Sequence, residues 1–262
     1  MPFTLSHAAA GLPLRRIKYL STVPLLLGTF MPDVPQYLPV RLQQLVLDDT
    51  HSFSGLFTVS LPLGMAMLLT ILLLQEPLTA LLSERARWVC LQALERFAGL
   101  RRRWLVAAIS ILVGAWTHIA WDSFTHPDGW TATRVAALNA PLDLFGWHTQ
   151  LSHVLQYVSS VFGLAVLAWW YPRLAASAPV AVRSDPNRGR LRVLLVLVFC
   201  AAMLIGGMQA VREAYEVHVS SFYYMTDLVL THTLSWFALL YIVAGLLVGR
   251  SRRVVAQPAV KP

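Results

Sequence analysis

One short segment, Thr117 to His126, combines two histidines with a carboxylate at helical spacing. His118 and Asp122 are four residues apart, so on a helix they project from one face about 6 Å apart along the axis and can chelate one cation. His126 lies on that face one turn further on, about 12 Å from His118 along the axis. The two histidines are too far apart to share an ion, but Asp122 can bridge two metal ions with one histidine on each. The alternative is a hydrogen-bonded His118–Asp122 pair at a helix end.

Further candidate ligands lie in the N-terminal third of the chain. Thr4 is a suitable helix N-cap, which places His7 in the first helical turn. Asp33 directly follows an apolar run in a proline-rich turn. The cluster Asp48-Asp49-Thr50-His51 precedes another apolar run, where a helix N-terminus favours an anion. Taken singly, His7 can be a core histidine, Asp33 a turn former, and the residues before His51 helix caps.

The remaining histidines and both cysteines are weaker candidates. His148 and His153 flank the start of an apolar run, and His232 lies inside another, where it can hydrogen-bond between helices. Cys90 and Cys200 are far apart and lie in or beside apolar helices. They predict neither a disulfide nor a thiolate metal site.

The composition shows which elements must position these side chains. The chain has 262 residues, of which 56% are hydrophobic and 13% charged, and its mean hydropathy is +0.58. Such a chain is too apolar for a soluble domain. Because about 20 apolar residues span a bilayer, the sequence predicts an all-α polytopic membrane helix bundle with five spans. These are Leu56–Leu74, Trp104–Trp121, Leu151–Tyr171, Leu191–Val211 and Leu228–Val248.

A sixth apolar segment, residues 19–31, is shorter than the others. It contains Pro24 and Gly28 and ends at Met31-Pro32-Asp33. Its length is typical of a re-entrant or interfacial segment, although a full crossing stays open. The late basic cluster and the lack of a small-residue cleavage site argue against a signal peptide.

The basic residues predict the orientation of the bundle. Six Lys or Arg residues lie in 75–103, four in 172–190 and four in 249–262, but only one in 122–150 and one in 212–227. Cytoplasmic loops are rich in Lys and Arg, so we expect loops 75–103 and 172–190 and the C-terminus in the cytoplasm. The net charge of +8 is then explained without nucleic acid. We expect one membrane domain at 1–248, followed by a disordered basic tail at 249–262.

The same orientation gathers most acidic residues and histidines on the opposite, extracytoplasmic side. This asymmetry brings the predicted ligands toward one face of the membrane. The expected metal ligands are His7, Asp33, His51, His118 and Asp122, and the expected acid–base residues are His126 and Asp49.

Several motifs resemble a bacterial family of membrane proteins. The motifs are Pro2-Phe3-Thr4-Leu5-Ser6-His7, Met31-Pro32-Asp33, Thr50-His51-Ser52, Gly114 to His118, Trp121 to Trp130 and Leu155 to Ser160. Together they resemble domain-of-unknown-function family 4184, over Met1 to about Val248. This resemblance implies no reaction.

A more distant likeness is to the membrane-bound metal-dependent hydrolases of bacterial inner membranes. That family carries an N-terminal His, a Pro-Asp, a histidine pair ending in Thr-His-Ser, and a Ser-His-x-x-x-Asp. His7, Asp33, His51, His118 and Asp122 match these positions in order. The family's acidic run after Pro-Asp and the first histidine of its pair are missing here. Asp48, Asp49 or His126 is therefore the candidate for the missing metal ligand.

The sequence therefore predicts a metal-dependent hydrolase in the bacterial cytoplasmic membrane. The expected cofactor is one or two divalent ions, with Zn²⁺ favoured by the His/Asp ligand set. A site at the headgroup level suggests a phosphoester or lipid-linked substrate. The alternative is a non-enzymatic membrane protein, such as a transporter, scaffold or partner subunit, in which the same residues form a structural metal or hydrogen-bond network. The oligomeric state is left open.

Overall fold

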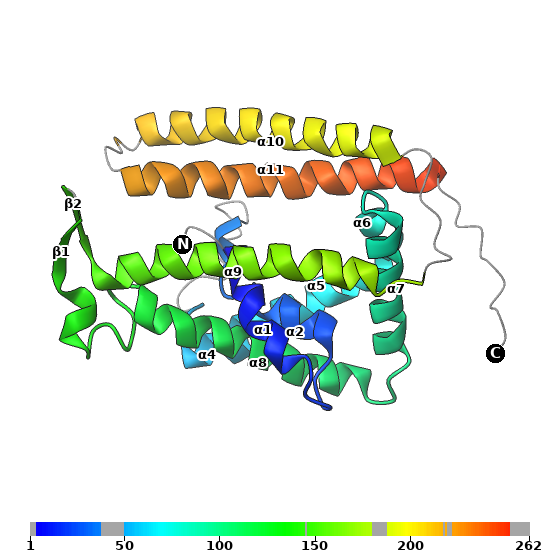
Figure 1. Ribbon diagram of the computed structural model, residues 1–262, viewed down its shortest axis with the longest axis horizontal. Coiled ribbons are helices and arrows are strands. Elements are labelled where there is room, and N and C mark those ends of the chain that lie inside the picture. The colour runs from blue at the N-terminus through cyan, green and yellow to red at the C-terminus, as the bar shows by residue number, and fades with distance from the viewer. Residues whose placement is uncertain are drawn as a thin grey trace.

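The computed structural model describes residues 4–37, 50–144, 146–179, 188–216, 218 and 222–251 (Figure 1). Five helices within these residues are long and apolar enough to cross a membrane. They are Phe53–Leu73, Arg103–Thr125, Leu151–Ala176, Gly189–Glu216 and Tyr224–Val248. Each overlaps one of the five predicted spans, which confirms the prediction of an all-α, multi-pass membrane protein.

The first span contains an irregular turn close to His51. It is built from α4 (Phe53–Gly55), η3 (Leu56–Ser60) and α5 (Leu61–Leu73). The side chain of Ser52 caps α4 by accepting the backbone N–H of Gly55 over 2.9 Å. The η3 segment is one turn of π-helix, a feature that is frequent at functional sites.

The second and third spans, α8 (Arg103–Thr125) and α9 (Leu151–Ala176), pack against each other. Between them lie η4 (Ala136–Asn139) and a hairpin of β1 (Pro141–Leu144) and β2 (Trp147–Gln150). The strands are antiparallel, with Pro141 opposite Gln150. At the hairpin turn Gly146 has a φ of 86°, which glycine adopts without strain.

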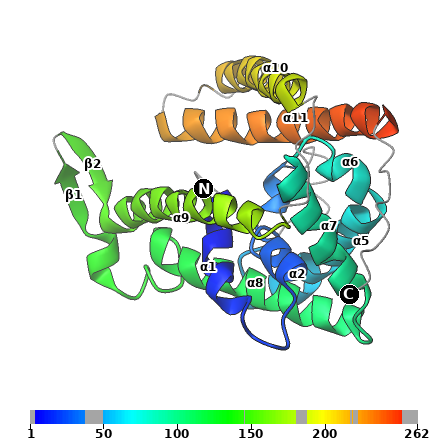
Figure 2. The same ribbon diagram turned by 45° about the vertical axis from the view of Figure 1, so that its right-hand side comes forward.

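The last two spans, α10 (Arg188–Glu216) and α11 (Phe222–Ser251), form an antiparallel pair beside the other helices (Figures 1 and 2). Small residues allow their backbones to approach, since a Cβ on Gly206 would lie 2.6 Å from the backbone nitrogen of Thr233. A second close contact, between Gly245 of α11 and the carbonyl of Pro77, joins this pair to the rest of the bundle.

The N-terminal segment folds as a short hairpin. After η1 (Thr4–His7), α1 (Ala8–Leu14) leads to a turn, α2 (Thr22–Gly28) returns, and η2 (Val34–Tyr37) follows. With seven residues, α2 rises only about 10 Å, against the roughly 30 Å of a hydrocarbon core. The segment is therefore helical and short, as predicted, and its re-entrant or interfacial position stays a prediction.

Two glycines set the position of this hairpin on α8. A Cβ on Gly114 would lie 2.2 Å from the carbonyl oxygen of Leu25, and one on Gly28 would lie 2.3 Å from that of Ile111. The backbones of α2 and α8 are therefore in direct contact. Asp33 follows Gly28 by five residues and His118 follows Gly114 by four, so this contact fixes their separation.

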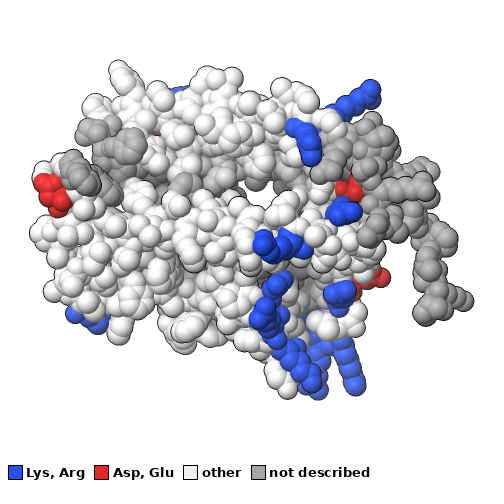
Figure 3. Space-filling model, in the orientation of Figure 1, with Lys and Arg blue, Asp and Glu red and all other residues white. Residues whose placement is uncertain are grey.

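The predicted loop at 75–103 contains two helices, α6 (Gln75–Thr79) and α7 (Glu84–Ala98). They are joined by an ion pair between the buried Arg87 and Glu76. Figure 3 shows Lys and Arg side chains gathered mostly toward this end of the bundle. Whether this end faces the cytoplasm stays a prediction, and most of the predicted tail at 249–262 lies outside the described residues.

Candidate metal centre

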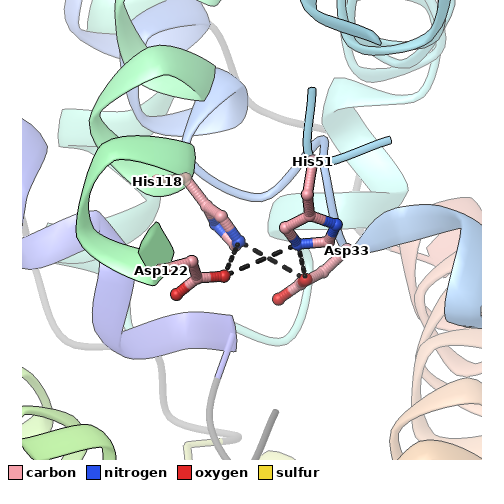
Figure 4. A group of neighbouring side chains, drawn as sticks. All are labelled: Asp33, His51, His118 and Asp122. Carbon is pink, nitrogen blue, oxygen red and sulfur yellow. Dashed lines mark hydrogen bonds and ion pairs between the residues drawn. The ribbon is translucent and has the colours of Figure 1, made fainter. Parts of the chain in front are cut away.

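Four side chains from three parts of the chain converge between the N-terminal hairpin and α8 (Figure 4). Asp33 comes from the turn after α2, His51 from the residues before α4, and His118 and Asp122 from successive turns of α8. One ligand atom from each lies within 4.8 Å of all the others. This group brings together four of the five predicted metal ligands.

The four N–O distances between these atoms are compatible with ligands of one metal ion. His118 Nε2 lies 3.1 Å from Asp122 Oδ2 and 3.4 Å from Asp33 Oδ1. His51 Nε2 lies 3.2 Å from Asp33 Oδ1 and 3.5 Å from Asp122 Oδ2. A tetrahedral Zn²⁺ with bonds of about 2.0–2.1 Å separates its ligand atoms by about 3.3–3.4 Å. The four distances cluster around that value.

The partners of His118 present the correct nitrogen to this point. The ring is fully buried, and its Nδ1–H donates to the carbonyl of Thr29 over 2.7 Å. Nε2 therefore carries the lone pair, the arrangement common in metal-binding histidines. Neither His118 Nε2 nor the buried Asp122 Oδ2 has a hydrogen-bond partner of acceptable geometry among the described residues.

Asp33 is held by side chains of the N-terminal segment. Thr4 donates to its Oδ2 over 2.6 Å, and Gln36 Nε2 donates to its Oδ1 over 3.1 Å. The Tyr37 hydroxyl in turn lies 2.7 Å from the Thr4 hydroxyl. The roles of Gln36 and Tyr37 were not predicted from the sequence, and Thr4 was expected there only as a helix cap. Spacing did not reveal them, because Thr4 lies 29 residues from Asp33.

The predicted ligand His7 lies beside this group, on the other side of Asp122. Its Nε2 is 3.5 Å from Asp122 Oδ1, and its ring stacks on that of His118 with centroids 3.8 Å apart. Burial, together with the neighbouring His118, lowers the pKa of His7 to about 4. His7 is therefore neutral near pH 7, the form that binds metal.

His126 lies on the same side of Asp122 as His7. It follows the end of α8 in an extended conformation, and its Nδ1 lies 3.2 Å from the backbone carbonyl of Asp122 and 3.8 Å from Oδ1. Gln156 Nε2 lies 3.0 Å from His126 Nε2. An amide donor facing Nε2 places the ring proton on Nδ1. Asp122 thus has one oxygen toward His51 and His118 and the other toward His7 and His126, the placement expected of a bridging carboxylate.

The charges of this group require a compensating cation. Burial lowers the pKa of His51, but its close contacts with the carboxylates of Asp122 and Asp33 outweigh burial and raise the pKa to about 9. Burial also opposes ionisation of Asp33, yet His118 and His51 hold its pKa well below the usual range. Two buried carboxylates stay ionised only beside positive charge, which protonated histidines or a metal ion can supply.

Among the described residues, the weaker candidates His148 and His232 do not join this group. Asp49 and its neighbour Asp48 lie outside the described residues. His148 is exposed on the β-hairpin, and its Nδ1 lies 3.3 Å from Asp143 Oδ2. His232 pairs with Glu213 between α10 and α11, with 2.7 Å between His232 Nε2 and Glu213 Oε2.

Fold and centre together define a multi-pass helical membrane protein with a His/Asp cluster between a short N-terminal hairpin and its first two spans. The chain matches the family model described as Domain of unknown function (DUF4184) over residues 1–250, and it belongs to this family. No curated protein and no solved structure matches it. The likeness to the membrane-bound metal-dependent hydrolases stays a prediction.

Proposed function

We propose that this protein is a metal-dependent hydrolase of the bacterial cytoplasmic membrane. Asp33, His51, His118 and Asp122 hold a divalent metal, for which Zn²⁺ fits the donor set, and His7 with the second oxygen of Asp122 offers room for another ion. The observation that carries the proposal is the set of four N–O distances, 3.1–3.5 Å, between His51 and three buried side chains, which come from three parts of the chain. An ordinary hydrogen-bonded His–Asp pair needs one nitrogen and one oxygen, whereas here two imidazole nitrogens and two carboxylate oxygens surround one point.

A metal ion in this centre would activate a water molecule, whose pKa falls to about 7 when bound to zinc. His126 would act as general acid or base, because the contact with Gln156 directs its Nδ1–H toward Asp122. His118 and His51 would bind the metal in their neutral forms, so metal binding near pH 7 would displace a proton from His51. Asp49 stays a second acid–base candidate from the sequence alone.

A cavity that leads to the metal centre supports a catalytic role for the metal over a purely structural one. A cavity of about 570 Å³ reaches the centre at His7 and Asp122. A catalytic metal needs one position open to water or substrate. Since the centre lies near one end of the spanning helices, we propose a phosphoester or lipid-linked substrate on the extracytoplasmic side, with the C-terminus in the cytoplasm.

One observation favours the rival, a non-enzymatic protein such as a transporter, scaffold or partner subunit. Four protein ligands are enough to close a tetrahedral site, as in structural zinc centres. The rival predicts bound metal without hydrolysis.

Metal content and hydrolysis test the two functions in one series of variants. The wild type, purified in detergent, should carry roughly one or two metal ions per chain, as measured by elemental mass spectrometry. His118→Ala and Asp122→Ala should lose the metal, while His148→Ala, which removes an exposed histidine, should keep it. Metal-free wild type would refute the site. Metal-loaded wild type that cleaves neither bis(p-nitrophenyl) phosphate nor a fluorescent phospholipid would favour the rival.

A further inference from the structure

The cavity that reaches the metal centre extends away from it between α1, α8 and α9. His7, Asp122 and Gln156 line the end at the centre. At the opposite end, the guanidinium of Arg15 lies over the ring of Trp170, 5.3 Å from its centroid. Figure 2 shows α1 lying beside both α8 and α9, and residues of all three helices line the cavity. The cavity is therefore elongated, with one end at the candidate reaction centre.

The wall between the two ends is apolar and borders the membrane. Leu12, Phe162 and Val166 are among the residues that line it. Phe162 is 68% exposed and the neighbouring Trp169 is 59% exposed, although both belong to the spanning helix α9. Exposed apolar side chains on a spanning helix face lipid. An occupant can therefore enter this cavity sideways from the bilayer.

The end at the centre contains a polar atom that lacks a partner. Gln156 is 4% exposed, and its Oε1 has no hydrogen-bond partner among the described residues. Its Nε2 is already engaged with His126. Buried polar groups are normally satisfied by protein, water or ligand. Gln156 also lines the cavity, so its side chain marks the polar end of this space.

The length of the cavity suits one lipid chain. Gln156 and Trp170 mark its two ends on α9 and lie fourteen residues apart, about 21 Å along a helix. One leaflet of the hydrocarbon core is about 15 Å thick, half of the bilayer value. The space is long enough for an acyl chain that runs from the headgroup level past the middle of the membrane.

We propose that this cavity binds one acyl chain of a phosphate-bearing membrane lipid, with the headgroup beside His7, Asp122 and Gln156. The position of the headgroup rests on the proposed function, since it makes the lipid the substrate of the metal centre. The position of the chain rests only on the cavity and its exposure to the bilayer.

A phospholipid with a photoactivatable diazirine in its acyl chain tests where the chain lies. With the full chain in proteoliposomes, labelling at Leu12 should exceed labelling at Val193, an exposed residue of α10 that contacts bulk lipid. Val166→Trp fills the cavity and should reduce Leu12 labelling to the Val193 level. Val161→Trp makes the same change on the exposed face of α9, outside the cavity lining, and should leave labelling unchanged.

Two further measurements separate this proposal from the proposed function. His118→Ala, which removes a metal ligand, should keep the labelling at Leu12, because the chain position does not require metal. Val166→Trp should lose hydrolysis of a diacyl phospholipid but keep hydrolysis of the water-soluble bis(p-nitrophenyl) phosphate. Labelling without any hydrolysis would refute the enzyme and leave the chain site standing. Leu12 labelling no higher than that of Val193, or phospholipid hydrolysis unaffected by Val166→Trp, would overturn the lipid site.

Discussion

Thr4 offers a sharp test of the metal centre, because it contacts a candidate ligand without being one. Its hydroxyl donates to Oδ2 of Asp33 over 2.6 Å, and both residues are buried, with exposed fractions of 6% and 0%. Valine has nearly the same shape as threonine but cannot donate this hydrogen bond. Thr4→Val should therefore weaken metal binding with little change in packing.

The size of the effect follows from the charge of the acceptor. A hydrogen bond to a charged group contributes about 1.5–3 kcal/mol, and about 1.4 kcal/mol corresponds to a tenfold change in Kd. The Kd for Zn²⁺ should rise about 10- to 100-fold, the range typical of groups that hold metal ligands in place. Thr4→Ser keeps the hydroxyl and should restore most of the affinity.

Competition with a chromophoric zinc chelator in detergent measures this Kd, and circular dichroism checks that each variant is folded. A folded Thr4→Val variant that binds Zn²⁺ as tightly as the wild type would refute the assignment of Asp33 as a ligand. Weakening in both Thr4→Val and Thr4→Ser would mean that packing, rather than the hydroxyl, matters here.

Three further predictions concern orientation, packing and catalysis. A reporter fused after Arg103 should be active on the cytoplasmic side and one fused at Asp143 on the outer side; the reverse pattern would place the metal centre near the cytoplasm. Gly114→Ala should destabilise the protein by about 1–3 kcal/mol in thermal unfolding and lower its metal content, because its Cβ would meet the backbone of α2. Gly207→Ala, with open space around the added Cβ, is the matched control and should cost little; equal losses would argue against the close contact. His126→Ala should keep the metal but lower kcat about 10²- to 10⁴-fold, and unchanged kcat would remove it from the mechanism.

The membrane architecture could be predicted from the sequence, because a membrane span is recognised from the mean hydropathy of a whole segment. Five apolar runs long enough to cross a bilayer predict five spans, whatever their contacts. The short segment ending at Asp33 was also predicted, since a short run interrupted by Pro24 and Gly28 is typical of a re-entrant or interfacial segment. The helices α6 and α7 and the β-hairpin were not predicted. They lie in polar stretches that the sequence analysis treated as loops.

The candidate metal centre could be predicted only in part. His118 and Asp122 share one helix face, so their proximity follows from a four-residue spacing. His7, Asp33 and His51 have no such local relation to α8, and the sequence sorted them only to the same side of a membrane. The role of Gln156, which contacts His126 across 30 residues of sequence, had no signal of this kind.

The sequence by itself determined the class of the protein and the residue types available for chemistry, because both depend on local composition and spacing. Tertiary structure alone decided that these residues meet. Contact between the backbones of α2 and α8 at Gly28 and Gly114 sets Asp33 against His118, and the residues before α4 bring in His51. Only packing in three dimensions brings four separate donors to one point, and only packing places a cavity beside them.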